Sequence, residues 1–115
     1  MDVSINPDLL SDIRYGLSHR IGKENAITSG KIIEALSKKG YYLTGAVIRA
    51  HIHYLRTYDK LFICGDSNGY YLPKNEIEAT HQLRSLQSRI KEMTEVVECL
   101  KESYRKKFSQ TALFE

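Results

Sequence analysis

The last third of the chain carries its strongest periodic signal. From Ala79 to Tyr104, apolar residues recur in steps that alternate between four and three residues, which is the a/d pattern of a coiled-coil helix. Asn75 follows Pro73 and can cap the start of this helix. The pattern therefore predicts one long helix whose apolar positions bind a second chain. The predicted dimerisation residues are Leu83, Leu86, Ile90, Met93, Val97, Leu100 and Tyr104.

The length of this helix limits what can cover its apolar stripe. About 30 residues at roughly 1.5 Å per residue reach about 45 Å, which exceeds the diameter expected of a domain of this size. We therefore favour a homodimer over a helix that folds back onto its own domain. The direction of the two strands stays open, because Ala79 occupies a d position and charge pairs between g and e positions are scarce.

Start and stop signals divide the preceding residues into short helices. Asn6 followed by Pro7 is a typical first turn, because Asn caps a helix and Pro fits its first position. Thr28 and Thr44 are candidate caps further on, and Gly40 ends the segment between them. The apolar spacing then predicts helices at residues 7–20, 29–37 and 44–57.

Residues 61–74 read LFICGDSNGYYLPK and predict a β-hairpin. The flanks, residues 61–64 and 70–72, are aromatic, aliphatic or β-branched, and the residues between them, Gly65-Asp66-Ser67-Asn68-Gly69, are typical of a tight turn. An isolated two-stranded hairpin is only marginally stable in water, so we expect this one to pack against the helices.

Composition limits the chain to one globular unit with an appendage, because 115 residues suffice for one core and not for two. We expect a domain at residues 1–74, a dimerisation helix at 75–109 and a flexible tail at 110–115. No apolar run approaches the roughly 18 residues of a membrane span and no leader is recognisable, so we expect a soluble protein of the cytoplasm. The net charge of +3 is mildly basic.

The segments ITSGKIIEALSKKGYYLTGAVIRAHIHYLR and LFICGDSNGYYLPK give the order helix, tight turn, helix, hairpin, after a first helix. This order resembles the winged helix-turn-helix, in particular small proteins of phages and bacteria in which a long C-terminal helix follows the wing. The resemblance implies a mainly α fold with one β-hairpin, in which residues 44–57 form the recognition helix and the hairpin is the wing. It also implies binding of double-stranded DNA, although a minority of winged helices dock proteins instead.

The outer face of the predicted recognition helix suits DNA. If Ile48, Ile52 and Leu55 are buried, Arg49 and His53 lie on the opposite face, one turn apart. Arg can bind guanine through two hydrogen bonds, and lysines around the helix suit phosphates. The predicted DNA-binding residues are Lys38, Lys39, Thr44, Arg49, His53, Arg56, Lys60, Ser67, Asn68 and Lys74.

The sequence holds no pattern that indicates catalysis or a cofactor. His51 and His53 lie about 200° apart on a helix and cannot chelate one metal, so we expect His51 to be packed in the core. No glycine-rich phosphate loop, GxSxG or HExxH motif occurs. We therefore expect no enzyme, no metal and no cofactor. The prediction is a dimeric regulator or replication accessory protein, in the host cytoplasm if phage-encoded; the alternative is a protein-docking adaptor, loader or inhibitor.

Overall fold

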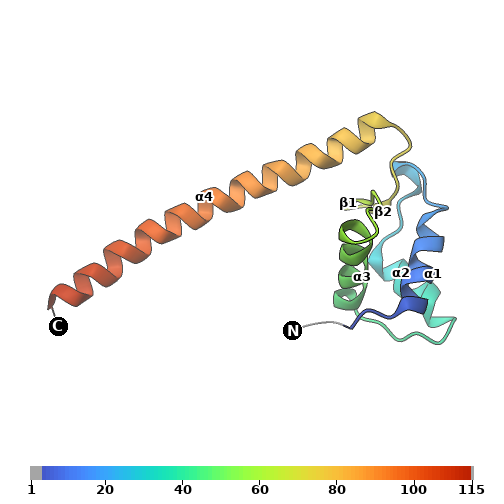
Figure 1. Cartoon of the computed structure of the whole chain (residues 1–115), viewed down its shortest axis with the longest axis horizontal. Helices are drawn as coiled ribbons and strands as arrows, with labels where there is room; N and C mark the ends of the chain where they lie inside the picture. The colour runs from blue at the N-terminus through green and yellow to red at the C-terminus, as the bar shows by residue number, and fades with distance from the viewer. Residues whose placement is uncertain (1–3, 115) are drawn as a thin grey trace. The chain divides into compact units, whose positions relative to one another are not determined.

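The computed structural model describes residues 4–114 of the chain, and the side chains of residues 4–108 (Figure 1). In chain order its elements are α1 (Pro7–Leu17), the 3-10 helix η1 (Lys23–Asn25), α2 (Ser29–Ser37), α3 (Gly45–Thr57), β1 (Cys64–Asp66), β2 (Gly69–Tyr71) and α4 (Glu76–Phe114). The prediction of a mainly α chain with one hairpin and a long C-terminal helix is confirmed. Residues 110–115 were expected to form a flexible tail. The backbone of residues 110–114 is instead part of helix α4, and Glu115 lies outside the described residues.

Each α-helix begins at a residue whose side chain accepts a backbone N–H from the first turn. Oδ1 of Asn6 accepts from Asp8 and Leu9, and the hydroxyl groups of Thr28 and Thr44 accept from the third residue after each. The end of α1 differs from the expected Arg20. The N–H groups of residues 19 and 20 bond to carbonyl groups three residues back, so the chain tightens and leaves the α-helix after Leu17.

The hairpin is shorter than expected and begins later. Cys64 pairs with Tyr71 and Asp66 with Gly69, so that Ser67 and Asn68 form a two-residue turn. The predicted first strand at residues 61–64 is therefore wrong except at its last residue. Residues 61–63 instead follow the end of α3 and are held to it, because the N–H of Leu61 donates to the carbonyl of Leu55.

A third segment completes the hairpin. Ile27 exchanges two backbone hydrogen bonds with Tyr70, at 2.9 and 2.8 Å, and Leu72 is bonded to the backbone of Arg20 and Gly22. Strand β2 thus lies between β1 and the residues that precede α2. This pairing supplies the support that a lone hairpin lacks.

The core is one cluster shared by α1, α2 and α3. Eight of its nine buried residues come from positions three or four apart on the three helices, which is why the helical spacing identified them, and the ninth, Ile63, precedes β1. Ile48, His51 and Leu55 of α3 are fully buried, so α3 is the central helix of the cluster. The buried members are Leu9, Ile13, Leu17, Ile32, Leu36, Ile48, Ile52, Leu55 and Ile63.

The chain divides into two compact units, of which the first ends at Gln82 and the second is the remainder of α4. The first turns of α4 belong with the hairpin because of two polar side chains. Oε1 of buried Gln82 accepts the N–H of Gly65 at 3.1 Å, and the carboxylate of Glu78 accepts the N–H groups of Lys23 and Lys74 at 3.2 and 3.1 Å. The first unit therefore extends beyond residue 74, where the sequence places its boundary.

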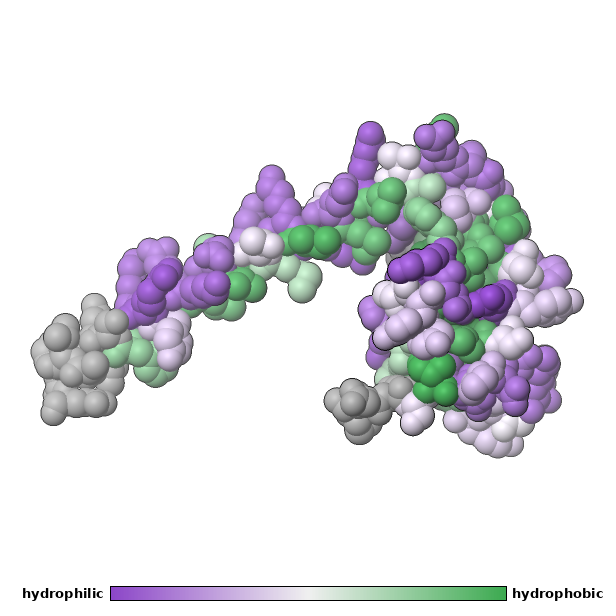
Figure 2. All heavy atoms as spheres, in the orientation of Figure 1, coloured by the Kyte–Doolittle hydropathy of each residue, from purple (hydrophilic) through white to green (hydrophobic). Residues whose placement is uncertain are grey.

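The second unit is a single helix with a repeated apolar face. Large apolar side chains remain exposed along it, and Figure 2 shows them recurring along α4 between hydrophilic residues. Over the described part of the chain, none of the helices has an apolar stretch long enough to cross a membrane.

Candidate nucleic-acid interface

Helix α3 presents two chemically distinct faces. Ile48, Ile52 and Leu55 are buried as expected, whereas Arg49 and His53 are exposed on the other side. These two side chains are separated by one helical turn and can reach the same ligand. The outer face of α3 thus combines a guanidinium group with an imidazole.

Small residues lie beside this pair toward the start of α3. Ala46 is exposed and Ala50 half-buried there, whereas Arg56 and Thr57 follow His53 toward the end of the helix. The hydroxyl of exposed Thr44 accepts the N–H of Val47 at 3.4 Å and caps the helix. A polyanion could therefore approach the N-terminal half of α3 closely, where the helix dipole also favours negative charge.

Two of the predicted DNA-binding lysines are paired with carboxylates. Nζ of Lys39 lies 3.2 Å from Oδ1 of Asp12, and Nζ of Lys74 lies 3.2 Å from both carboxylate oxygens of Glu24. The backbone amide of Glu24 and the Lys74 ammonium lower the pKa of the Glu24 carboxyl. Both lysines would have to leave or share these partners in order to bind a phosphate.

Arg56 is a structural residue as well as a predicted contact. Its Nε donates to the carbonyl of Ile63 at 2.9 Å, and its guanidinium lies against Gly65, where an added Cβ would be 3.3 Å away. Arg56 therefore ties the end of α3 to β1. The hairpin and α3 are neighbours, as the prediction required.

Three predicted cations are not engaged by the fold: the side chains of Lys38, Arg49 and Lys60 are exposed and make no ion pair or hydrogen bond within residues 4–108. Lys31, in the first turn of α2, is in the same situation and was missed by the sequence analysis. These four cations are available to an outside ligand without breaking a contact of the fold.

The hairpin tip is acidic rather than basic. Oδ1 of Asp66 accepts the N–H of Asn68 at 2.7 Å, and Oδ2 lies 3.8 Å from Nζ of Lys23. Ser67 and Asn68 are exposed, so their side chains can meet a ligand. Sequence reasoning placed both at the tip but missed Lys23, since nothing local indicates a partner so far along the chain.

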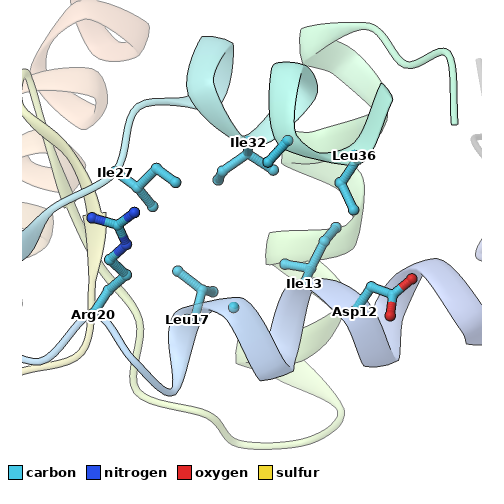
Figure 3. Close-up of a pocket in the computed structure, with 9 residues that line it drawn as sticks. Asp12, Ile13, Leu17, Arg20, Ile27, Ile32 and Leu36 are labelled. Atoms are coloured by element: carbon cyan, nitrogen blue, oxygen red, sulfur yellow. The ribbon is translucent and has the colours of Figure 1, made fainter. Parts of the chain in front are cut away.

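A cavity of about 200 Å³ lies between α1 and α2 (Figure 3). Ile13 and Leu17 of α1 point into it from one side and Ile27 and Ile32 from the other, while Arg20 and Asp12 lie at opposite ends. Arg20 donates to the carbonyl of Asn25 at 3.5 Å and Asp12 is paired with Lys39, so both charged ends have partners within the fold. The walls are apolar, and the cavity has no arrangement suited to catalysis.

Comparison of the chain with protein-family models, with curated proteins and with solved structures found no match. Among the described residues, no three His, Cys, Asp or Glu side chains are grouped so that they could hold a metal ion.

Proposed function

We propose that the first unit is a winged helix-turn-helix that binds double-stranded DNA, with α3 as the recognition helix and the hairpin as the wing. The chain would act as a small regulator or replication accessory protein in the cytoplasm, that of the host if a phage encodes it. The element order and the hairpin that packs beside α3 support the fold assignment.

One observation carries the proposal: the side chains of Arg49 and His53 are exposed on the outer face of α3, make no hydrogen bond or ion pair within residues 4–108, and lie beside the small Ala46 and Ala50. A solvated arginine on a central helix is the side chain best suited to read guanine, because its two N–H groups match the O6 and N7 acceptors. The alanines permit the helix to enter the major groove and contact a thymine methyl group.

The unpaired lysines supply the second part of binding. Lys31, Lys38 and Lys60 can contact phosphates, which fixes the position of α3 on the duplex without reading sequence. Lys39 and Lys74 contribute less in this proposal, since each is already paired with a carboxylate.

Two copies would strengthen binding. A single helix and a short hairpin make few contacts, whereas a homodimer through α4 doubles them on a site with two half-sites. The exposed apolar residues of α4 support such a dimer.

The acidic hairpin tip supports a second candidate, in which the unit docks a protein as an adaptor, loader or inhibitor. Asp66 supplies a carboxylate at the tip and Lys23 is paired with it at 3.8 Å, so this pair offers a phosphate no free cation. A protein partner would tolerate this tip, so duplex binding has to be measured directly.

Fluorescence anisotropy with a pool of random-sequence duplexes tests the proposal. We expect binding that weakens steeply with salt, and Arg49→Ala should weaken it about tenfold or more. Lys74→Ala is the matched control. It also removes one positive charge, but Lys74 is already paired with Glu24, so its loss should weaken the affinity for DNA by less than about threefold. The proposal is contradicted if the wild-type chain does not bind duplex DNA at low salt, and the docking candidate then stands.

A further inference from the structure

A shallow depression lies on the second unit between Val97, Leu100, Lys101 and Tyr104, with Arg105 beside it. In the heptad frame that places Val97 and Tyr104 at position a, its first four residues occupy positions a, d, e and a. Coiled coils insert one side chain of the facing helix into a hole made by four such residues. The depression is therefore the kind of hole that an apolar side chain of a second helix fills.

The same frame runs along the exposed face of α4. Between about half and two thirds of the surface of each a and d residue from Ile90 to Tyr104 is in contact with solvent. A continuous apolar face of this kind marks a surface that binds a partner. Its exposed members are Leu83, Ile90, Met93, Val97, Leu100 and Tyr104, which with half-buried Leu86 we call the seam.

We propose that the seam packs against the seam of a second copy of this chain, as a parallel and in-register two-stranded coiled coil. The inference rests on the homodimer proposed above and adds its strand direction and register. Position a holds the β-branched Ile90 and Val97, and position d holds Leu86 and Leu100. β-branched residues at a with leucine at d are the combination that favours two parallel strands.

An antiparallel pair would place each a residue beside a d residue of the partner. One such register pairs Leu83 with Leu100 and Ile90 with Met93, and it brings Tyr104 beside Ala79, which is half-buried in the first unit. Parallel strands instead place Leu83 beside Leu83 and Ile90 beside Ile90, and Lys107 meets Lys107 only after the end of the seam. The preference for parallel strands therefore rests on the β-branched residues at a and the leucines at d.

The charges of α4 agree with parallel pairing. At the flanking positions, Arg89 would face Thr94 of the second copy and Lys101 would face Val96, so no like charges oppose each other. The acidic side chains occupy outer positions b, c and f and point away from the seam; they are Glu92, Glu95, Glu98 and Glu102. A consequence is that both first units begin at the same end of the coil, as two half-sites on one duplex require.

Cysteine cross-linking of the full chain tests the direction. Exposed Cys99 is first replaced by Ser, and Leu86→Cys or Leu100→Cys is then introduced separately. In a parallel, in-register dimer both variants should form a disulfide-linked dimer under mild oxidation. Ser88→Cys, at outer position f, is the control and should not. Residues 86 and 100 lie about 21 Å apart along a helix, so an antiparallel dimer can cross-link at no more than one of them.

Cross-linking at only one seam position, or equally at position 88, would overturn the proposal. So would a monomer by light scattering at micromolar concentration. Val97→Asp gives a second readout, with a dissociation constant raised at least about a hundredfold, whereas Glu95→Ala should leave it unchanged. None of these measurements contains DNA, so a failure here is separable from a failure of duplex binding.

Discussion

The backbone N–H of Asn6 donates a hydrogen bond to Nε2 of His51 over 3.2 Å, although 45 residues separate the two. Nδ1 of the same ring lies 2.8 Å from the carbonyl oxygen of Val47. A carbonyl can only accept, so Nδ1 carries the proton and Nε2 is the acceptor. His51 thus joins the residue that caps α1 to the interior of α3.

His51→Ala should lower the free energy of unfolding by about 2–4 kcal/mol, because it leaves a cavity in the core and an N–H without its partner. Urea denaturation measures this. His53→Ala is the matched control, since it removes an exposed histidine from the same helix and should change stability by less than about 0.5 kcal/mol. Equal losses in the two variants would contradict the buried position of His51.

Gly69→Ala should destabilise the first unit, because Gly69 has a φ of 119° and an added Cβ would lie 2.3 Å from the carbonyl oxygen of Ile27. We expect a loss of more than about 2 kcal/mol. In Gly16→Ala the new methyl group meets nothing within 4 Å, and a helical Gly→Ala change should raise stability by about 0.5–1 kcal/mol. The midpoint temperature of thermal unfolding should therefore fall in Gly69→Ala and rise in Gly16→Ala. A shift of both midpoints in the same direction would contradict this prediction.

Helix starts could be predicted from the sequence because their chemistry is local. Asn6, Thr28 and Thr44 each accept an N–H no more than three residues ahead. The structure begins α2 and ends it at the residues expected, Ser29 and Ser37. A cap and an apolar stripe suffice for this because both lie within the segment that they define.

The contacts that decide which cations are available could not be predicted in this way. Lys74 and Glu24 are 50 residues apart, and the bridge between Ile27 and Tyr70 joins single residues with no periodic pattern. Such contacts depend on how the chain folds over its full length. The sequence therefore predicted correctly which residues of α3 are exposed. It gave no indication of which lysines already have partners.

Lys60→Gly should stabilise the protein. Lys60 has a φ of 57°, in the left-handed region that costs most residues about 1–2 kcal/mol and glycine little. Part of that gain is lost to the greater freedom of glycine in the unfolded chain, so we expect a net increase of up to about 1 kcal/mol. Lys38→Gly removes the same charge where φ is −68° and should give no increase, which urea denaturation can check.

Stability should fall at alkaline pH because of Tyr71, which is 5% exposed. Burial, assisted by the nearby Cys64 thiol, raises the pKa of Tyr71 from 10.0 to about 12. Below pH 10 the folded and unfolded chains both keep the phenol proton, and the contribution to stability is complete. As the pH rises from 10 to about 12, the unfolded chain releases this proton first, so stability is lost across that interval.

Tyr71→Phe isolates this effect, because it has no phenol to ionise while the other groups titrate as in the wild-type chain. The free energy of unfolding is measured by urea denaturation at a series of pH values. That of the wild-type protein should fall relative to that of Tyr71→Phe between pH 10 and about 12, and the difference between the two should be constant below pH 10. Tyr42→Phe is the control, because Tyr42 is 88% exposed and its replacement should leave the pH dependence of the wild-type chain intact. Parallel curves for the wild-type chain and Tyr71→Phe through this interval would show that Tyr71 ionises as easily in the folded chain as in the unfolded one.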